Sequence, residues 1–250
     1  MPRLFALVAL VGALGAGTRA QDGRPLPDQG AFLTAARDNL GRSQREQHKY
    51  GYKERRGELH TNPFGRIGSG KGTSTWEVTP TADGAAYLRR LIEREGAPVT
   101  NGRVERQERR ARSGRSPLED TAAALTFTLD RREVRDGRDT IVIKFEPKPD
   151  AEPQTREGRL ARAFTGLVWV DEATREVVRA EATAIDDISY GVFVARLYKG
   201  TVVTLVRERI DDRIWQPTSL QFKGHGRAML FRRLIVDHAI QWFDYKRVLD

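Results

Sequence analysis

Hydrophobic and polar residues alternate most regularly in a stretch that begins at Phe164 and ends at Asp187. Its first half is rich in β-branched and aromatic side chains, which favour strands because they fit a pleated, half-buried surface. In its second half the apolar residues Val178, Ala180, Ala182 and Ala184 alternate with polar ones. A period of two places one set of side chains on a core and the other in water. The stretch therefore predicts a long β-hairpin whose turn is Asp171–Glu176, where Asp171 and Thr174 can bond nearby backbone N–H groups.

The turn also predicts which residues of the hairpin face each other. If Val170 lies opposite Val177, then Trp169 lies opposite Val178. The predicted inner face carries Trp169, Val178, Ala180 and Ala182. Small residues around one large aromatic side chain leave space on this face. Two interpretations stay open, namely a curved sheet packed on a helix and a ligand-accessible concavity.

The patterns in the N-terminal half are weaker. Asp28 is a helix-capping residue, and apolar residues recur after it at helical spacing, so we expect a helix from Asp28 to about Leu40. Tyr87–Glu93 has helical spacing of its apolar residues but lies between two turn signals. Residues 99–118 contain the almost wholly charged run Asn101–Arg115, which has no apolar face and predicts either an exposed helix or a linker.

Strand patterns fill the rest of the chain. Short runs of β-branched and aromatic residues, separated by glycine and aspartate, are typical of antiparallel strands joined in sequence. The predicted strands are Lys49–Arg56, Thr73–Thr79, Leu125–Leu129, Thr140–Phe145, Val192–Lys199, Thr201–Glu208, Ile214–Phe222, Arg227–Leu234 and Ile235–Tyr245. The predicted turns include Gly200, Asp211-Asp212 and Gly224–Gly226. The fold class is therefore mainly β with helices (α+β), built on an antiparallel meander.

The N-terminus has the pattern of a secretory signal. Arg3 precedes an apolar run that ends at Ala16, and a small-x-small cleavage site ends at Ala20. The run is too short to span a bilayer. No cysteine occurs in the chain, which excludes a lipid-anchored lipoprotein and a disulfide framework. We therefore predict an exported, periplasmic protein with a signal peptide at 1–20 and a single domain at 21–250.

The composition, with 39% hydrophobic and 31% charged residues, indicates a globular chain with a sizeable core. The formal net charge of +9 becomes +7 when Arg3 and Arg19 leave with the signal. A basic protein invites a nucleic-acid partner, but export separates this one from DNA, and acidic residues lie between the basic ones almost everywhere, so no clean basic stripe forms. We expect no nucleic-acid partner. The surplus charge fits peripheral contact with anionic lipid head groups or a plain solvated surface.

No catalytic or metal-binding motif is complete. Gly65–Gly72 nearly matches a phosphate-binding loop, but Gly72 stands where Ser or Thr must hold magnesium, and a strand follows where a helix is needed. The four histidines lack metal-ligand spacing, and no cysteine can complete a zinc site. Asp186 and Asp187 are adjacent at a strand end and point to opposite faces, so they do not form a metal-binding pair. We expect a protein that is not an enzyme and has no cofactor.

The order of the segments resembles a known family. The segments that carry the resemblance are Tyr87–Pro98 (YLRRLIEREGAP), Gly137–Pro149 (GRDTIVIKFEPKP) and Gly166–Asp171 (GLVWVD). Together with the exported helix-then-strand start, they look like bacterial envelope proteins related to the periplasmic lipoprotein carriers, the LolA/LolB-like half-barrels, over roughly residues 30–248. The resemblance implies an antiparallel sheet curled into an incomplete barrel, with helices covering the open side and an apolar concavity for acyl chains. It also implies that Tyr87–Glu93 is a strand.

We therefore predict a binding protein that holds a lipid or lipid-anchored ligand in an apolar concavity. It would act in lipoprotein sorting to the outer membrane or in lipid transport. Each buried acyl methylene contributes about 0.8 kcal/mol. The candidate ligand-binding residues, large apolar side chains on predicted strands, are Trp169, Phe193, Leu197, Leu205, Leu220 and Phe222. For each of them plain core packing is the alternative. The alternative function is a structural or adaptor module of the cell envelope that engages a protein partner, which a filled barrel interior would favour.

Overall fold

The computed structural model describes residues 23–60, 68–108, 117–190, 195–212, 214–228 and 232–249. The predicted signal peptide lies outside these residues. Helical elements are α1 (Gln29–Glu46), η1 (Gln47–Lys49), α2 (Pro117–Ala124) and α3 (Arg156–Ala161). The strands are β1 (Tyr50–His60), β2 (Gly68–Pro80), β3 (Ala86–Arg94), β4 (Ala97–Pro98), β5 (Val104–Glu108), β6 (Leu125–Arg135), β7 (Arg138–Pro147), β8 (Phe164–Asp171), β9 (Val177–Ala184), β10 (Ile188–Tyr190), β11 (Ala195–Leu197), β12 (Val202–Arg209), β13 (Trp215–Ala228) and β14 (Arg232–Arg247).

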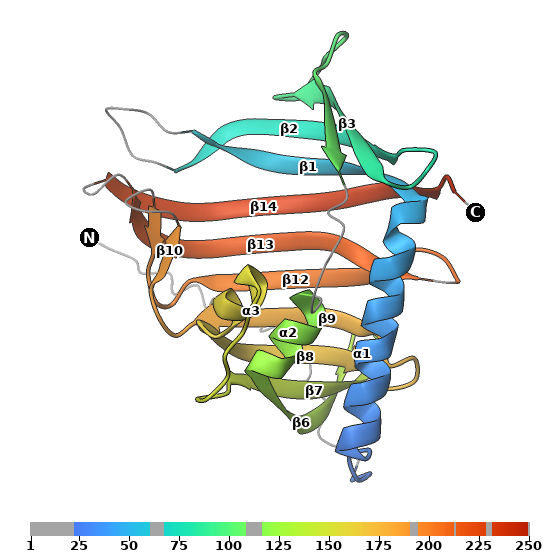
Figure 1. Cartoon of the computed structure of the whole chain (residues 1–250), viewed down its shortest axis with the longest axis vertical. Helices are drawn as coiled ribbons and strands as arrows, with labels where there is room; N and C mark the ends of the chain where they lie inside the picture. The colour runs from blue at the N-terminus through green and yellow to red at the C-terminus, as the bar shows by residue number, and fades with distance from the viewer. Residues whose placement is uncertain are drawn as a thin grey trace, which may run out of the picture.

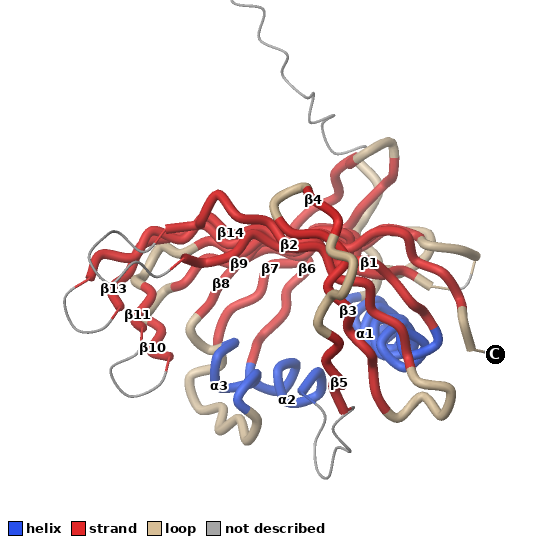
Figure 2. The backbone as a smooth tube through the Cα atoms, turned by 90° about the horizontal axis from the view of Figure 1, so that it is seen from above, coloured by secondary structure: helices blue, strands red, loops and turns tan. Residues whose placement is uncertain are grey.

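All described strands belong to one 14-stranded antiparallel sheet, seen face-on in Figure 1. Its order is β4-β3-β2-β1-β14-β13-β12-β9-β8-β7-β6, with β5 paired to β3, β11 to β13 and β10 to β11. In the described residues the two ends of this order are not paired with each other, so the sheet stays open. Seen from above it is curved, and the helices lie inside the curve (Figure 2). The predicted fold class, an α+β protein with an incomplete antiparallel barrel, is confirmed.

The long helix α1 crosses the inside of the sheet near one end of the strands (Figure 1). Its cap is the predicted one, because Asp28 Oδ1 accepts a hydrogen bond from the backbone N–H of Ala31 at 2.9 Å. The helix continues past Leu40 to Glu46, which corrects the predicted end. A tertiary contact supports the extra turns, since the buried side-chain amide of Gln216 donates to the carbonyl of Ser43 at 2.9 Å.

The short helices α2 and α3 form a pair that the hydrophobic pattern did not predict. A buried carboxylate joins them: Asp120 of α2 accepts hydrogen bonds from the Thr155 backbone N–H at 2.8 Å and from its hydroxyl at 2.7 Å. The same hydroxyl caps α3 by accepting from the N–H of Gly158 at 3.0 Å. Both helices lie on the inner side of the sheet with α1 (Figure 2).

Two ambiguous segments of the sequence form strands. Tyr87–Glu93 lies in β3, as the family resemblance implied. Residues Val104–Glu108, predicted as part of an exposed helix or linker, form β5 instead, paired with β3. Charged side chains are compatible with this edge strand because edge positions leave them in water. The rest of the charged run, 109–116, lies outside the described residues.

The predicted turn at Gly224–Gly226 is wrong, because both glycines lie inside β13. A Cβ atom at Gly224 would lie 2.4 Å from the hydroxyl oxygen of Thr201, and one at Gly226 would lie 2.2 Å from the carbonyl oxygen of Arg196. Glycine is therefore used here where a neighbouring side chain, at Gly224, or a neighbouring backbone, at Gly226, comes too close for a Cβ atom.

Candidate functional site

The helices identify which side chains face the inside of the curve. Phe32 of α1 packs on Ile141, Ile143 and Val170, so these residues point toward the helices. Side chains directly opposite each other in a strand pair share one face of the sheet. Strand register therefore extends the assignment from β7 and β8 to the other strands. We call the helix-bearing side the concave face.

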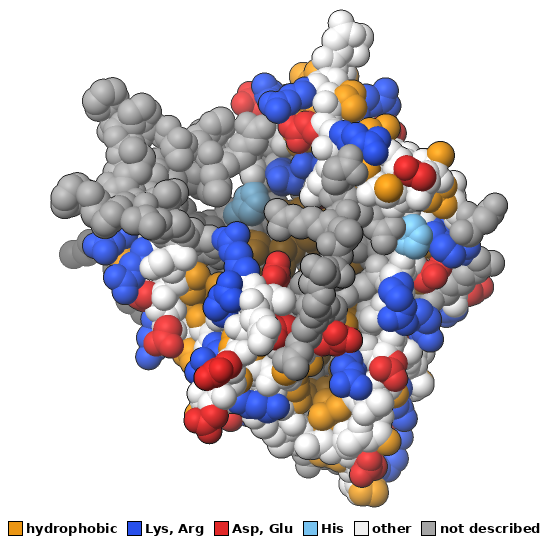
Figure 3. Space-filling model, viewed as in Figure 1, with side chains coloured by type: hydrophobic (Ala, Val, Ile, Leu, Met, Phe, Trp, Pro, Cys, Tyr) orange, Lys and Arg blue, Asp and Glu red, His pale blue; other side chains and the backbone are white. Residues whose placement is uncertain are grey.

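Two rows of side chains cross the concave face. The first row runs through Ile143, Val168, Ala180, Leu205, Leu220 and Ile240. The second row runs through Phe145, Gly166, Ala182, Val203, Phe222 and His238. We call the apolar residues of β9 to β14 in these rows the apolar band, namely Ala180, Ala182, Val203, Leu205, Leu220, Phe222 and Ile240. All seven are partly exposed, and Figure 3 shows hydrophobic side chains at the floor of a recess on this face.

Packed elements border the apolar band and leave its middle uncovered by any described cluster. On the β7 and β8 side, α1 packs on the sheet through Phe32 and Ala36. At one end of the strands, Leu160 and Ala163 pack against the cluster that contains Leu197, with Phe222 at its margin. The band residues outside the three hydrophobic clusters of the described chain are Ala180, Ala182, Val203, Leu205, Leu220 and Ile240. These six side chains keep part of their apolar area exposed to solvent.

Four of the six predicted ligand-binding residues gather on or beside this face. Leu205 and Leu220 lie directly opposite each other in the band. Phe222 belongs to the band and also contacts the buried cluster that contains Leu197. Leu197 is 9% exposed, so its environment is that of a core residue. Phe193 lies outside the described residues.

Trp169 lies on the opposite, convex face, and the predicted hairpin register is corrected by one residue. Val170 pairs with Val177 as expected, but a register shift follows, so Trp169 pairs with Arg179 and not with Val178. A bulge of this kind moves the following side chains to the other face. Beyond the bulge it is Val168, not Trp169, that shares a face with the alanines.

On the convex face the side chain of Trp169 is buried, packed and hydrogen-bonded. The indole is 3% exposed and packs with Val142, Val178 and Trp215. Its Nε1–H donates to Glu133 Oε1 at 2.6 Å, and the guanidinium of Arg135 lies 4.5 Å from the ring centroid. Burial by itself would raise the pKa of Glu133, but hydrogen bonds from Trp169 and nearby arginines outweigh it and hold that pKa below its ordinary value. These contacts assign Trp169 a structural role.

On β1, next to the β14 end of the first row, lies a cluster of charged side chains. Ile240 pairs with Arg56, and Trp242 pairs with Glu54. Glu54 is 8% exposed and accepts hydrogen bonds from Arg56 Nε at 2.8 Å, from Arg89 Nη2 at 2.9 Å and from Trp242 Nε1 at 3.1 Å. One carboxylate is therefore shared by two guanidinium groups. We call Glu54, Arg56 and Arg89 the Glu54 cluster.

His238 stands at the β14 end of the second row. It pairs with Phe222 of the band, and its Nδ1 atom is buried without a hydrogen-bond partner among the described residues. Burial, and secondly the charge of Arg56, lowers the pKa of His238, so the imidazole is neutral at neutral pH. A Cβ atom at Gly57 would lie 3.7 Å from Nδ1, which shows that the adjacent strand passes close to the ring without a side chain there.

A buried ion pair beneath α1 has a structural explanation. Arg207 Nη1 lies 3.6 Å from Glu176 Oε2, and the two side chains are 3% and 4% exposed. Arg207 also donates to the carbonyls of Val177 at 3.0 Å and Trp215 at 2.6 Å, while Arg42 of α1 donates to Glu176 at 3.3 Å. Burial lowers the pKa of Arg207, and the carboxylate opposes this effect. The pair attaches α1 to the sheet.

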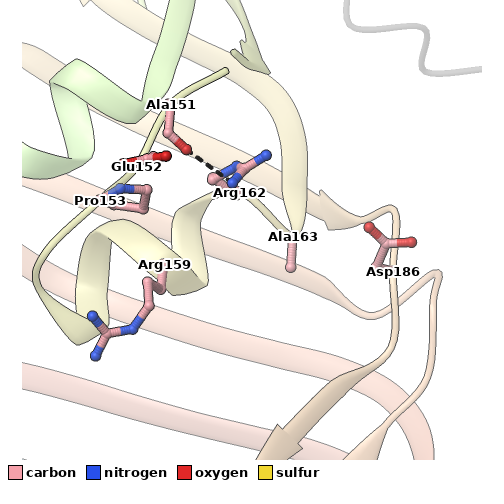
Figure 4. Close-up of a pocket in the computed structure, with 7 residues that line it drawn as sticks. All are labelled: Ala151, Glu152, Pro153, Arg159, Arg162, Ala163 and Asp186. Carbon is pink, nitrogen blue, oxygen red and sulfur yellow. Dashed lines mark hydrogen bonds between the residues drawn. The ribbon is translucent and has the colours of Figure 1, made fainter. Parts of the chain in front are cut away.

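A second hollow, of about 520 Å³, lies beside α3 (Figure 4). It is lined by Ala151, Glu152, Pro153, Arg159, Arg162, Ala163 and Asp186. Arg162 donates to the carbonyls of Ala151 and Pro149, both at 2.9 Å, and Arg159 donates to that of Gln154 at 2.7 Å. The two arginines thus attach the preceding loop to α3. The apolar band remains the stronger candidate site.

Within the described ranges, no three His, Asp or Glu side chains come together where a metal ion could bind. None of the helices described is both long and apolar enough to cross a membrane.

The comparisons with known proteins add a distant structural likeness. No protein-family model and no curated protein matches the chain. A solved LolA superfamily protein, NE2245 from Nitrosomonas europaea, is 12% identical, with 87% of this chain and 92% of that chain covered and a TM-score of 0.36. A DUF1329 family protein from Desulfovibrio piger is 14% identical, with the same coverages and a TM-score of 0.37. The chain is distantly similar to LolA-type proteins.

This finding agrees with the resemblance inferred from the sequence. A structure of MucB in complex with MucA(peri) is also similar, at 12% identity and a TM-score of 0.27, with 84% of this chain and 94% of that chain covered. At these identities and TM-scores the likenesses carry no argument about ligand or partner.

The prediction from sequence missed three residues around the band, His238, Ile240 and Arg56. Part of the signal was present, because alternation along the last predicted strand puts His238, Ile240 and Trp242 on one face. The neighbouring position of Arg56 was not predictable from that pattern. It depends on the pairing of the first strand with the last one.

Proposed function

We propose that the protein is an exported, non-enzymatic binding protein that holds the acyl chain of a lipid or lipid-anchored ligand against the apolar band. One observation carries the proposal: Val203, Leu205, Leu220 and Ile240 lie side by side on the inside of a curved sheet and remain partly exposed. Apolar side chains in such a position gain free energy when a hydrocarbon chain removes water from them.

The dimensions of the band suit a chain laid across the strands. From β9 to β14 there are three inter-strand spacings, about 14 Å in total. Each methylene removed from water contributes about 0.8 kcal/mol, so a few contacts give useful affinity without any covalent step. The open sheet lets the chain enter and leave while the core stays folded, as lipid transport or lipoprotein sorting requires.

The test compares substitutions on the two faces of one strand. Leu205→Gln and Leu220→Gln place a polar amide in the band, and each is expected to weaken binding of a fluorescent fatty acid by at least about tenfold. Val206→Gln is the matched control, because Val206 is also partly exposed but points to the convex face. It is expected to leave the dissociation constant unchanged.

Thermal unfolding of all variants separates lost binding from lost structure. A parent protein, purified after export, that binds no fatty acid would overturn the proposal. If that protein instead co-purified with an envelope protein released by the same band substitutions, the adaptor function would replace it. Equal weakening by Val206→Gln would also count against the band.

A further inference from the structure

We infer that the protein selects anionic amphiphiles, and that His238 and Arg56 hold the carboxylate or phosphate group at the end of the acyl chain. The inference rests on the proposed function, since it places the head of the same ligand whose chain lies on the apolar band. The ligand is then an anionic amphiphile whose head group lies at the β14 end of the band.

The strand register places both residues at one limit of the band. His238 follows Phe222 in the second row, and Arg56 follows Ile240 in the first. His238 and Ile240 are two residues apart on β14, so His238 and Arg56 are diagonal neighbours across adjacent strands, about 7–8 Å apart at their Cα atoms. An oxyanion with two or three oxygens can contact both side chains from one position.

His238 has the capacity for a hydrogen bond that the described residues do not use. Its Nδ1 atom is buried and unpaired, which is uncommon because buried polar atoms generally have a partner. The ring is neutral at neutral pH, since burial lowers the pKa of His238. In the tautomer with hydrogen on Nδ1 it would donate one hydrogen bond to a ligand oxygen.

Arg56 supplies the positive charge. Glu54 Oε1 accepts from both its Nε and its Nη2 atoms and so fixes the direction of the guanidinium group. The same carboxylate also accepts from Arg89 and Trp242, so its charge is divided among several donors. Arg89 also lies 3.8 Å from Glu105, a carboxylate that Arg103 approaches to 3.2 Å. Three guanidinium groups therefore face two carboxylates, and the surplus positive charge attracts an incoming anion.

Two arginines at another border of the concave face are placed less well for this role. Arg159 and Arg162 line the hollow beside α3 together with two carboxylates, those of Glu152 and Asp186. Figure 4 shows the two guanidinium groups pointing in different directions. Arg162 is therefore a useful control, because it offers the same charge at another border of the concave face.

The experiment measures dissociation constants for a saturated fatty acid and for the fatty alcohol of the same length. The parent protein is expected to bind the acid at least about tenfold more tightly than the alcohol. His238→Leu and Arg56→Gln are each expected to remove most of this preference and to leave alcohol binding within about twofold of the parent. Arg162→Gln is expected to keep the preference, and Arg56→Lys, which retains the charge, to keep part of it.

The outcomes separate the two proposals. Equal binding of acid and alcohol by the parent, or loss of the preference in Arg162→Gln alone, would overturn the position of the head group and leave acyl-chain binding intact. A parent that binds neither compound would overturn both. The thermal midpoint of His238→Leu gives an independent check: it should not fall, because the substitution removes an unpaired buried nitrogen. A large fall, with the preference unchanged, would make His238 purely structural and refute the inference.

Discussion

Replacing Ala180 with phenylalanine is expected to weaken acyl-chain binding while the protein stays folded. Ala180 lies on β9 between Val168 and Leu205 in the first row, and it is partly exposed. Ala184 lies on the same face of the same strand but is 1% exposed and packs in the cluster that contains Leu197. The two alanines therefore offer the same substitution in an open and in a filled environment.

The expected magnitudes differ between the two positions. At Ala180 the phenyl ring enters the recess, so stability should change little, and exclusion of about two methylene groups of the ligand costs about 1.6 kcal/mol, or about fifteenfold in affinity. At Ala184 the ring must displace packed neighbours, which costs about 1–3 kcal/mol. For a domain of this size each kcal/mol lowers the melting temperature by about 2–4 °C. Ala184→Phe should therefore melt about 2–12 °C below the parent.

Two measurements test this expectation: thermal unfolding followed by circular dichroism, and displacement of a fluorescent fatty acid. A loss of melting temperature in Ala180→Phe as large as that in Ala184→Phe would show that the band is a packed core. Unchanged affinity in a folded Ala180→Phe variant would show that the acyl chain does not cross β9. Either result would refute the assignment of Ala180 to the binding surface.

Two further predictions concern stability. Gly224→Ala should lower the free energy of unfolding, measured by urea denaturation, by about 1–3 kcal/mol, because its Cβ atom would lie 2.4 Å from the hydroxyl oxygen of the buried Thr201. Gly30→Ala is the control and should not lower it, because the nearest atom to its Cβ would lie 3.6 Å away. Equal effects of the two substitutions would contradict this account. The hydrogen bond and charge of Arg132 hold the pKa of Glu172 below 4.5, so this contribution to stability is present above pH 4.5 and is lost as the pH falls through the folded-state pKa. Glu172→Gln should therefore destabilise the protein at pH 7 and lose that difference in acid; a difference that does not depend on pH would disprove the linkage.

Local pattern predicted many of the elements, for identifiable reasons. The alternation after Glu176 predicted a strand, which the chain forms as β9, and Asp28 supplied a helix cap that the folded chain uses. The pattern failed where one residue type has two uses. Glycine at 224 and 226 predicted a turn but allows close approach of strands, and the charged residues at 104–108 predicted a helix or linker but occupy an edge strand.

The sequence by itself determined the fold class, the large apolar side chains available for binding, and the absence of a complete catalytic motif. Only the tertiary structure decided which of those side chains share a face. A single register shift between Trp169 and Val170 separates Trp169 from the alanines, and the pairing of β14 with β1 brings His238 beside Arg56. Both features depend on strand register. Backbone hydrogen bonds are compatible with many registers, and only the packing of the whole sheet against its helices selects one of them.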